Sequence, residues 1–122
     1  MITLEDVKNN EEVQAFVNAS QKQLEALGYT EHSNRHIGIV SERTGEILKK
    51  LGYDERTVEL GRIAGYLHDI GNCVNRVDHA HSGAILAYNI LKEMGMLPED
   101  RTEIVMAIGN HDEGTGTAVS SI

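Results

Sequence analysis

The feature that most constrains this chain is the spacing of its apolar residues, which recur every three to four positions over most of its length. Such spacing places one side of an α-helix against a core. A half-buried strand would instead need apolar and polar residues to alternate, and almost no segment of useful length shows that alternation. The sequence therefore predicts an all-α fold.

Residues that favour helix starts and helix ends divide the chain into about six helices. Thr3 followed by Asp6 forms a capping box for a short first helix. Asp54 and Asp78 are good N-caps, Pro98 suits the first turn of a helix, and glycine suits the position just after one. The expected helices are a short one after Thr3, then 11–27 before Gly28, Ser33 or Asn34 to Leu51 before Gly52, Asp54 to Ile70 before Gly71, Asp78 through Leu91 to a point before Gly95, and Pro98 through Ile108.

Each of the longer helices carries an apolar face of the kind that packs into a core. Hydrophobic residues make up 40% of the 122 residues and charged residues 25%, which suits one globular core and excludes a disordered chain. We therefore expect a single domain over residues 1–122. The residues expected to face the core are Val13, Phe16, Val17, Leu24 and Leu27; then Ile37, Val40, Thr44, Ile47 or Leu48, and Leu51; then Ile63, Ala64 and Leu67; then Ile85, Leu86, Ile90 and Leu91; and finally Ile104, Val105 and Ile108.

The segment from Gly114 to Ile122 is interpreted as a loop that leads into another element. Ala118, Val119 and Ile122 form the beginning of an apolar face with nothing after it. One interpretation is a short frayed tail, which is common at chain ends. The other is that a C-terminal helix of the bundle lies beyond residue 122.

The charge balance and the lack of targeting signals narrow the classes of function. Lys and Arg number 11 and Asp and Glu 19, a net charge of −8, so we expect no binding to a nucleic-acid polymer. No apolar run approaches the ~20 residues of a membrane span, and the N-terminus has no signal-peptide pattern. Cys73 is the single cysteine and cannot form an internal disulfide. These features predict a cytoplasmic protein that does not bind membranes.

Three of the six histidines fall on the inward faces of three different predicted helices. His36 shares a side with Val40, His68 follows Ala64 by four residues, and His111 continues the apolar stripe of the last helix. An imidazole buried without a partner costs roughly 1–3 kcal/mol. A main-chain carbonyl satisfies most single core histidines, whereas a shared metal ion would satisfy several at once.

Asp69 is an independent reason to expect a cation. It lies in the last turn of the predicted fourth helix, where the helix dipole disfavours a carboxylate by ~0.3–1 kcal/mol. Either solvent stabilises this carboxylate, or a cation beside it reverses the preference. Because His68 directly precedes Asp69, a kinked helix end could place both side chains on one ion.

These residues resemble the HD-domain metal-dependent phosphohydrolases. The segment from Tyr66 to Asn72 is similar to the central motif of that family, and the segment from Asp78 to Leu86 is similar to the one that carries its next histidine. The resemblance extends over about residues 33–113. The residues that carry it are His36, Leu67-His68-Asp69-Ile70-Gly71, His79 with Gly83-Ala84, and His111.

The resemblance implies an HD-domain helical bundle with one or two divalent metal ions at its centre. His36, His68 and Asp69 would bind the first metal, and Asp69 would bridge to a second metal held by His79 and His111. This ligand pattern is similar to the binuclear branch of the family. Imidazole and carboxylate ligands together favour Fe or Mn, with Co, Ni or Zn as further choices.

The resemblance also implies a catalytic function on a small phosphorylated substrate such as a nucleotide. Asp69 would bridge the metals, while Arg35 and Asn72 are candidates to contact the substrate phosphate. Glu113 is a candidate general acid or base, or could orient His111. For Arg35 an ordinary exposed arginine, and for Glu113 a charged loop, remain open. Members of this family often form homodimers, so a homodimer is also expected.

Two other functions stay open at this point. The motif of the family ends with a further aspartate on a later helix, and no residue after Glu113 is acidic. Either that ligand lies beyond residue 122, or the site is incomplete and the chain is a catalytically impaired binding or regulatory module of the HD fold. The binuclear branch also includes di-iron oxygenases, which is the third interpretation.

Overall fold

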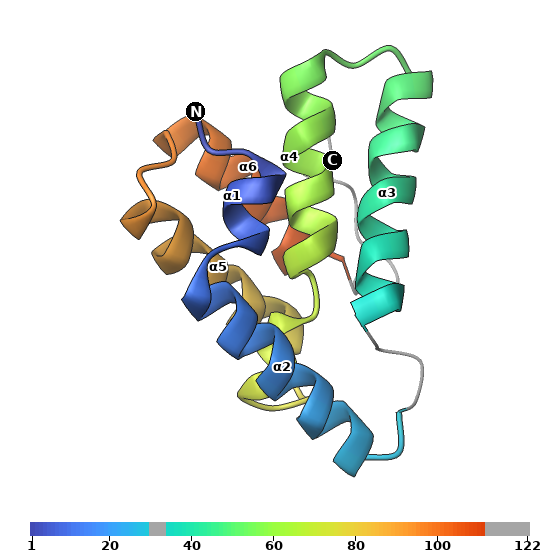
Figure 1. Cartoon of the computed structure of the whole chain (residues 1–122), viewed down its shortest axis with the longest axis vertical. Coiled ribbons are helices and arrows are strands. Elements are labelled where there is room, and N and C mark those ends of the chain that lie inside the picture. Colours follow the sequence, from blue (N-terminus) through green and yellow to red (C-terminus); the bar gives the residue numbers. More distant parts are fainter. Residues whose placement is uncertain (30–33, 112–122) are drawn as a thin grey trace.

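The computed structural model describes residues 1–29 and 34–111, and over these ranges it is entirely helical, which confirms the predicted fold class (Figure 1). Six α-helices and one short 3₁₀-helix follow one another without a strand in the described residues. Their bounds are α1 (Leu4–Lys8), α2 (Glu11–Ala26), α3 (Asn34–Lys50), α4 (Glu55–Leu67), the 3₁₀-helix η1 (Ile70–Cys73), α5 (His79–Glu93) and α6 (Pro98–Gly109).

Most of the predicted helix ends are present. Thr3 and Asp6 form the reciprocal capping box of α1, and the Asp54 side chain accepts a hydrogen bond from the Thr57 amide at the start of α4. Pro98 occupies the first turn of α6. Gly28, Gly52 and Gly95 each follow a helix with φ near +89°, a conformation that strains residues with a Cβ atom.

The helices pack in pairs around a common apolar core. α3 and α4 lie side by side and antiparallel, α5 packs against α6, and η1 packs against both α2 and α5 (Figure 1). α4 also contacts α6, so it joins the two pairs. The largest fully buried side chains come from α2, α4, η1, α5 and α6: Leu24, Ile63, Leu67, Ile70, Leu91, Ile104 and Ile108.

No helix in the described ranges is long and apolar enough to span a membrane.

Small residues let α3 and α4 approach closely. A Cβ atom added to Gly65 would lie 3.0 Å from the Cα atom of Ser41, and the Ser41 hydroxyl donates to the Arg62 carbonyl at 2.8 Å. This contact brings the first half of α3 against the last turn of α4. His36 and His68 lie in those two regions, so the close approach positions them for one site.

Three residues predicted to face the core, Leu27, Leu51 and Ile85, are instead exposed, whereas of the alternatives Ile47 and Leu48 the structure buries Leu48. Leu27 is 54% exposed, Ile47 58%, Leu51 69% and Ile85 64%. Leu27 and Leu51 lie just after the last residues of α2 and α3, where the helical face has ended. Within the helices, small residues occupy several of the inward positions. The buried positions of α3 and α5 include Ser41, Gly45, Gly83, Ala84 and Ala87, and close helix packing at these positions turns the larger neighbours outward.

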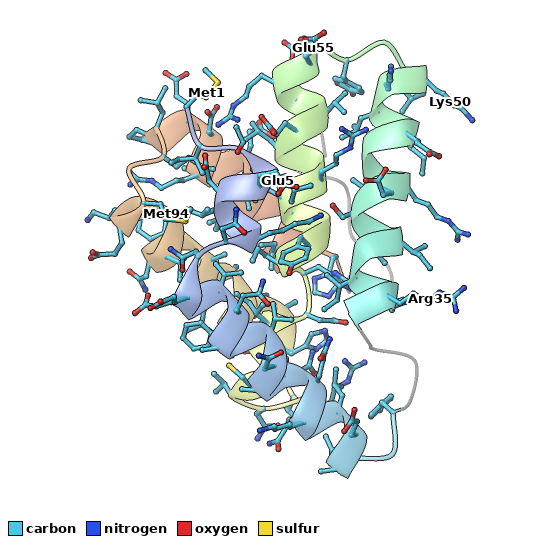
Figure 2. The ribbon with its side chains drawn as sticks, viewed as in Figure 1. Met1, Glu5, Arg35, Lys50, Glu55 and Met94 are labelled. Carbon is cyan, nitrogen blue, oxygen red and sulfur yellow. The ribbon has the colours of Figure 1, made fainter. Side chains whose placement is uncertain are left out.

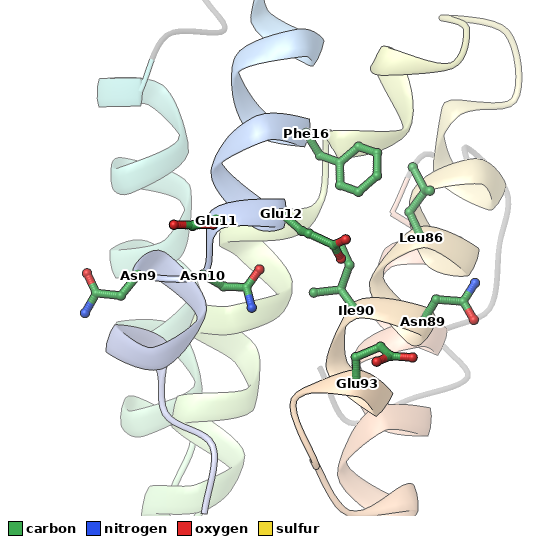
Figure 3. A pocket seen from close by; sticks show the side chains of 9 residues that line it. All are labelled: Asn9, Asn10, Glu11, Glu12, Phe16, Leu86, Asn89, Ile90 and Glu93. Atoms are coloured by element: carbon green, nitrogen blue, oxygen red, sulfur yellow. The ribbon is translucent and has the colours of Figure 1, made fainter.

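A cleft of about 690 Å³ lies between the α1–α2 junction and α5 (Figure 3). Phe16, Leu86 and Ile90 form its apolar floor, and the carboxylates of Glu12 and Glu93 lie at its rim. Its lining contains none of the histidines discussed above. The inward histidines therefore lie elsewhere in the bundle.

Candidate metal centre

The segment after α4 turns earlier than the sequence predicts. α4 ends at Leu67 rather than at Ile70, His68 occupies the C-cap, and Asp69 has left the helix with φ −103° and ψ 2°. Gly71 is therefore not the residue that stops the helix. A Cβ atom at Gly71 would overlap the His79 carbonyl, so its glycine is needed for the close approach of η1 to α5.

Five side chains converge from four parts of the fold into two groups that share one residue. The ligand atoms of His36, His68 and Asp69 all lie within 4.8 Å of one another, and so do those of Asp69, His79 and His111. They come from the first turn of α3, the end of α4, the first turn of α5 and the turn after α6. Tertiary packing thus joins residues that are up to 75 positions apart in sequence, from 36 to 111.

Asp69 lies between the two groups and presents one carboxylate oxygen to each. Its Oδ2 atom is 3.2 Å from Nε2 of His68, and its Oδ1 atom is 3.8 Å from Nε2 of His79. The residue is only 5% exposed. A buried carboxylate needs compensating charge or hydrogen bonds, and an ion on either side would supply positive charge.

Main-chain carbonyls fix the orientation of three of the histidines. Nδ1 of His68 donates to the Gly65 carbonyl at 2.6 Å, and Nδ1 of His111 donates to the Ile108 carbonyl at 2.6 Å. Nδ1 of His79 donates to the Arg76 carbonyl at 3.1 Å. A carbonyl oxygen can only accept, so each Nδ1 must carry the proton. In the neutral imidazole the lone pair is then on Nε2, as a metal ligand requires.

The donor set fits a metal ion. Nε2 of His79 and Nε2 of His111 are 3.2 Å apart, and their rings meet at 70° with centroids 5.1 Å apart. With both Nδ1 protons used by carbonyls, two neutral rings would direct lone pairs at each other, which is repulsive unless a proton or a cation lies between them. Imidazole nitrogen together with carboxylate oxygen is a donor set suited to first-row transition metals.

Asp69 is itself held in place by the buried side chain of Asn72. Nδ2 of Asn72 donates to the Asp69 carbonyl at 2.8 Å and lies 3.5 Å from Oδ1 of the same residue. The Asn72 oxygen accepts from Nη1 of Arg76 at 3.1 Å. Asn72 is 0% exposed. Its amide is thus engaged within the protein, on the side of Asp69 that faces His79.

The other predicted site residues lie outside these two groups. Arg35 is exposed on the first turn of α3, and Figure 2 shows its side chain directed away from the bundle. Asn72 is close to the site but buried as described, so its amide orients Asp69. Glu113 lies outside the described residues. The phosphate-binding and acid–base roles of these three residues therefore remain predictions.

The structure corrects one expected helix cap near the site. Asp78 lies at the N-cap position of α5 but has φ 62°, and its side chain accepts no capping hydrogen bond. Its Oδ1 atom instead lies 2.7 Å from Nδ1 of His81, and both side chains are more than 60% exposed. The competing pair with His81 replaces the cap. His81 therefore serves as a control histidine outside the metal-binding groups.

Sequence reasoning missed the groups that hold the ligands in place. The carbonyls of Gly65, Arg76 and Ile108 each lie three residues before the histidine that they bind. Main-chain carbonyls are present at every residue, so residue type gives no signal for them. Arg76 could have been noticed, because it lies four residues after Asn72 and three before His79.

The sequence pattern of the HD domain matches residues 34–118, which is more than half of the chain. The chain belongs to the HD domain family. An uncharacterized protein of Methanocaldococcus jannaschii is 30% identical to it over 134 aligned residues, covering 90% of this chain and 51% of that protein. The chain thus spans about half the length of this curated relative. No solved structure matches the chain significantly.

This HD domain brings together the five residues that the family resemblance picked out as ligands. They form two groups of His and Asp side chains, each of which could hold a metal ion. The matched residues 34–118 include all four parts of the chain that supply these five side chains. The fold and the possible metal-binding groups of an HD domain are therefore both present in this chain.

Proposed function

We propose that this HD domain is a metal-dependent phosphohydrolase that acts on a small phosphate ester or nucleotide. The observation that carries the proposal is the geometry of Asp69, whose two oxygens face His68 and His79, respectively, at 3.2 and 3.8 Å. A carboxylate placed in this way can serve two adjacent metal ions at once. Two-metal sites with a shared clamp are typical of phosphoryl-transfer hydrolases.

In this proposal the two groups of side chains hold two ions. His36, His68 and Asp69 would hold one, and Asp69, His79 and His111 the other. Fe, Mn, Co, Ni and Zn suit these ligands better than Mg or Ca does, and Fe or Mn is the choice that the resemblance to the family suggests. Bound divalent ions of this kind polarise a phosphoryl oxygen and lower the pKa of a bound water to about 7.

The contribution of the protein is to present these ligands in one protonation state and one orientation. The carbonyls of Gly65, Arg76 and Ile108 keep the Nδ1 protons away from the metal side of three rings. The burial of Asp69 strengthens its interaction with any cation, because the local dielectric is lower than that of water. Hydrolysis would then join water oxygen to phosphorus, break the ester P–O bond, and transfer a proton to the leaving oxygen.

The negative charge of the chain favours a small substrate over a polymeric one. A net charge of −8 opposes the long-range approach of a polyanion such as a nucleic acid. A small phosphate ester carries few charges and gains from the local positive field of bound metal ions. Arg35 and Glu113 remain candidates to contact phosphate and to transfer protons.

The test begins with the metal content of protein purified without chelator, measured by elemental mass spectrometry. We expect about two equivalents of Fe or Mn per chain. The same protein, supplied with Mn²⁺, is then assayed for release of nitrophenol or phosphate from p-nitrophenyl phosphate, bis-p-nitrophenyl phosphate and a nucleotide panel. Hydrolysis that is lost in Asp69→Ala and retained in the matched control His81→Ala supports the proposal.

Two other outcomes would contradict the phosphohydrolase proposal and favour a different function. Metal bound at full occupancy with no hydrolysis of any phosphate ester would favour the binding or regulatory module. An iron spectrum that changes on exposure to oxygen with an organic substrate, with no phosphate released, would favour oxygenase chemistry.

A further inference from the structure

Arg76 lies in the loop between η1 and α5 and contacts the site in two ways. Its Nη1 atom donates to Oδ1 of Asn72 at 3.1 Å, and its main-chain carbonyl accepts from Nδ1 of His79 at 3.1 Å. Its guanidinium carbon lies 4.9 Å from the centroid of the Tyr29 ring. The side chain is therefore held by an aromatic face on one side and by a buried amide on the other.

The contact with Arg76 decides which way the Asn72 amide faces. A guanidinium has only donors, so the oxygen of the amide must face Arg76 and its NH₂ group must face Asp69. That NH₂ group donates to the Asp69 carbonyl and lies 3.5 Å from Oδ1. Oδ1 is the oxygen of Asp69 that faces His79. Arg76 thus acts on both Asp69 and His79.

We propose that Arg76 is a positioning residue for the metal position formed by Asp69, His79 and His111. Its guanidinium sets the direction of the Asn72 amide, which donates to the Asp69 carbonyl and lies beside Oδ1, and its main-chain carbonyl sets the tautomer of His79. The other metal position depends on a different support, since Gly65 provides the carbonyl for His68. The inference rests on the proposed function only in requiring that the two groups bind metal ions.

The geometry of the arginine side chain explains why a lysine at residue 76 would replace Arg76 only in part. The flat guanidinium can stack on Tyr29 while directing an N–H at the Asn72 oxygen. A lysine would keep the charge and a donor but would lose the planar stacking. We therefore expect Arg76→Lys to restore part of what Arg76→Ala loses.

The test measures metal affinity rather than turnover, by isothermal titration calorimetry of metal-free protein with Mn²⁺. Wild type should show two binding events. Arg76→Ala should weaken one of them about 10- to 100-fold, the range typical for loss of a group that supports a metal ligand, and should weaken the other clearly less, because only Asp69 is common to both positions. Arg76→Lys should fall between the two. The matched control is Arg43→Ala, which removes an exposed arginine on α3.

Asn72→Leu is a second test, because it keeps the branched shape of the side chain and removes its hydrogen bonds to Asp69 and Arg76. It should weaken the same binding event as Arg76→Ala. Circular dichroism of each metal-free variant checks that the helices remain. If Arg76→Ala does not fold, the Mn²⁺ affinities of Arg76→Lys and Asn72→Leu test the role of Arg76 instead.

The possible failures are distinguishable. Two Mn²⁺ affinities in Arg76→Ala equal to those of wild type would overturn the role of Arg76 and leave the proposed function intact. Equal weakening of both binding events in folded Arg76→Lys and Asn72→Leu would show that the support is not specific to one position, and would also overturn the inference. A wild-type protein that binds no Mn²⁺ would overturn the proposed function, and this inference with it.

Discussion

Nε2 of His79 and Nε2 of His111 lie 3.2 Å apart, although the Nδ1 atom of each ring already donates to a main-chain carbonyl. The two rings come from the start of α5 and the turn after α6, which lie 32 residues apart in sequence. Without an ion, one proton must lie between the two nitrogens to avoid facing lone pairs. A cation bound between the two nitrogens would therefore remove the repulsion between their lone pairs.

Metal ions should stabilise the folded chain. A ligand that binds only the folded state at 100 times its Kd adds about 2.7 kcal/mol of stability. For a chain of this length that corresponds to a rise in Tm on the order of 10 °C. Differential scanning calorimetry of metal-free protein with and without Mn²⁺ measures the change. An unchanged Tm at saturating Mn²⁺ would contradict metal binding by the folded site.

Asp69→Asn should reduce metal binding at both positions, because it removes the negative charge that the two groups share while keeping the shape of the side chain. We expect at most one equivalent of metal per chain and a loss of hydrolysis of at least about 100-fold. Elemental analysis and the phosphate-ester assay measure the two effects. His81→Ala is the control, since His81 pairs with Asp78 at the surface. Full metal content in Asp69→Asn would show that the carboxylate is not a shared ligand.

Gly71→Ala should destabilise the protein even without metal. A Cβ atom at this position would overlap the His79 carbonyl, and backbone atoms there cannot move aside cheaply. We expect a loss of about 1–3 kcal/mol in the free energy of unfolding, as for other overpacked sites. Urea denaturation measures it. Gly38→Ala is the matched control, because nothing lies within 4 Å of its added Cβ and alanine favours a helix by up to about 1 kcal/mol.

The thiol of Cys73 should react slowly near neutral pH. Burial raises the pKa of this thiol above its ordinary value, so the thiolate, which is the reactive form, is scarce at pH 7 to 8. The rate of iodoacetamide alkylation should keep rising as the pH passes above 9. Denatured protein, in which the thiol is solvated, should react faster at pH 8. A native rate at pH 8 equal to the denatured rate would contradict the effect of burial.

Much of the fold could be predicted from local sequence signals. The capping box of Thr3 and Asp6, the N-cap Asp54, and Pro98 in the first turn of α6 all lie where they were expected. These are signals between neighbours in the chain, so they operate before any tertiary contact forms. The face of α5 was harder to predict, since Ile85 is exposed while the smaller Ala84 and Ala87 are buried. Close packing of helices at small residues outweighed the hydrophobicity of single side chains.

The residues of the candidate site could be predicted from the sequence, but most of the contacts between them could not. Sequence spacing placed His36, His68 and His111 on inward faces, and the family resemblance added Asp69 and His79. The structure brings these five residues together. It also buries Asn72 against Asp69, a contact that the sequence did not indicate, and the predicted contact of Asn72 with a substrate phosphate stays a prediction. An amide looks the same in sequence whether it faces solvent or a buried carboxylate.

The sequence by itself determined which helices form and which residues carry the chemistry, because helix periodicity, caps and residue type are local properties. Only the tertiary structure decided that Asp69 faces two groups of histidines, that carbonyls of Gly65, Arg76 and Ile108 set their tautomers, and that Arg76 supports one group. These relationships depend on distances between segments remote in the chain. Glycines such as Gly65 and Gly71 set those distances by allowing backbones to touch.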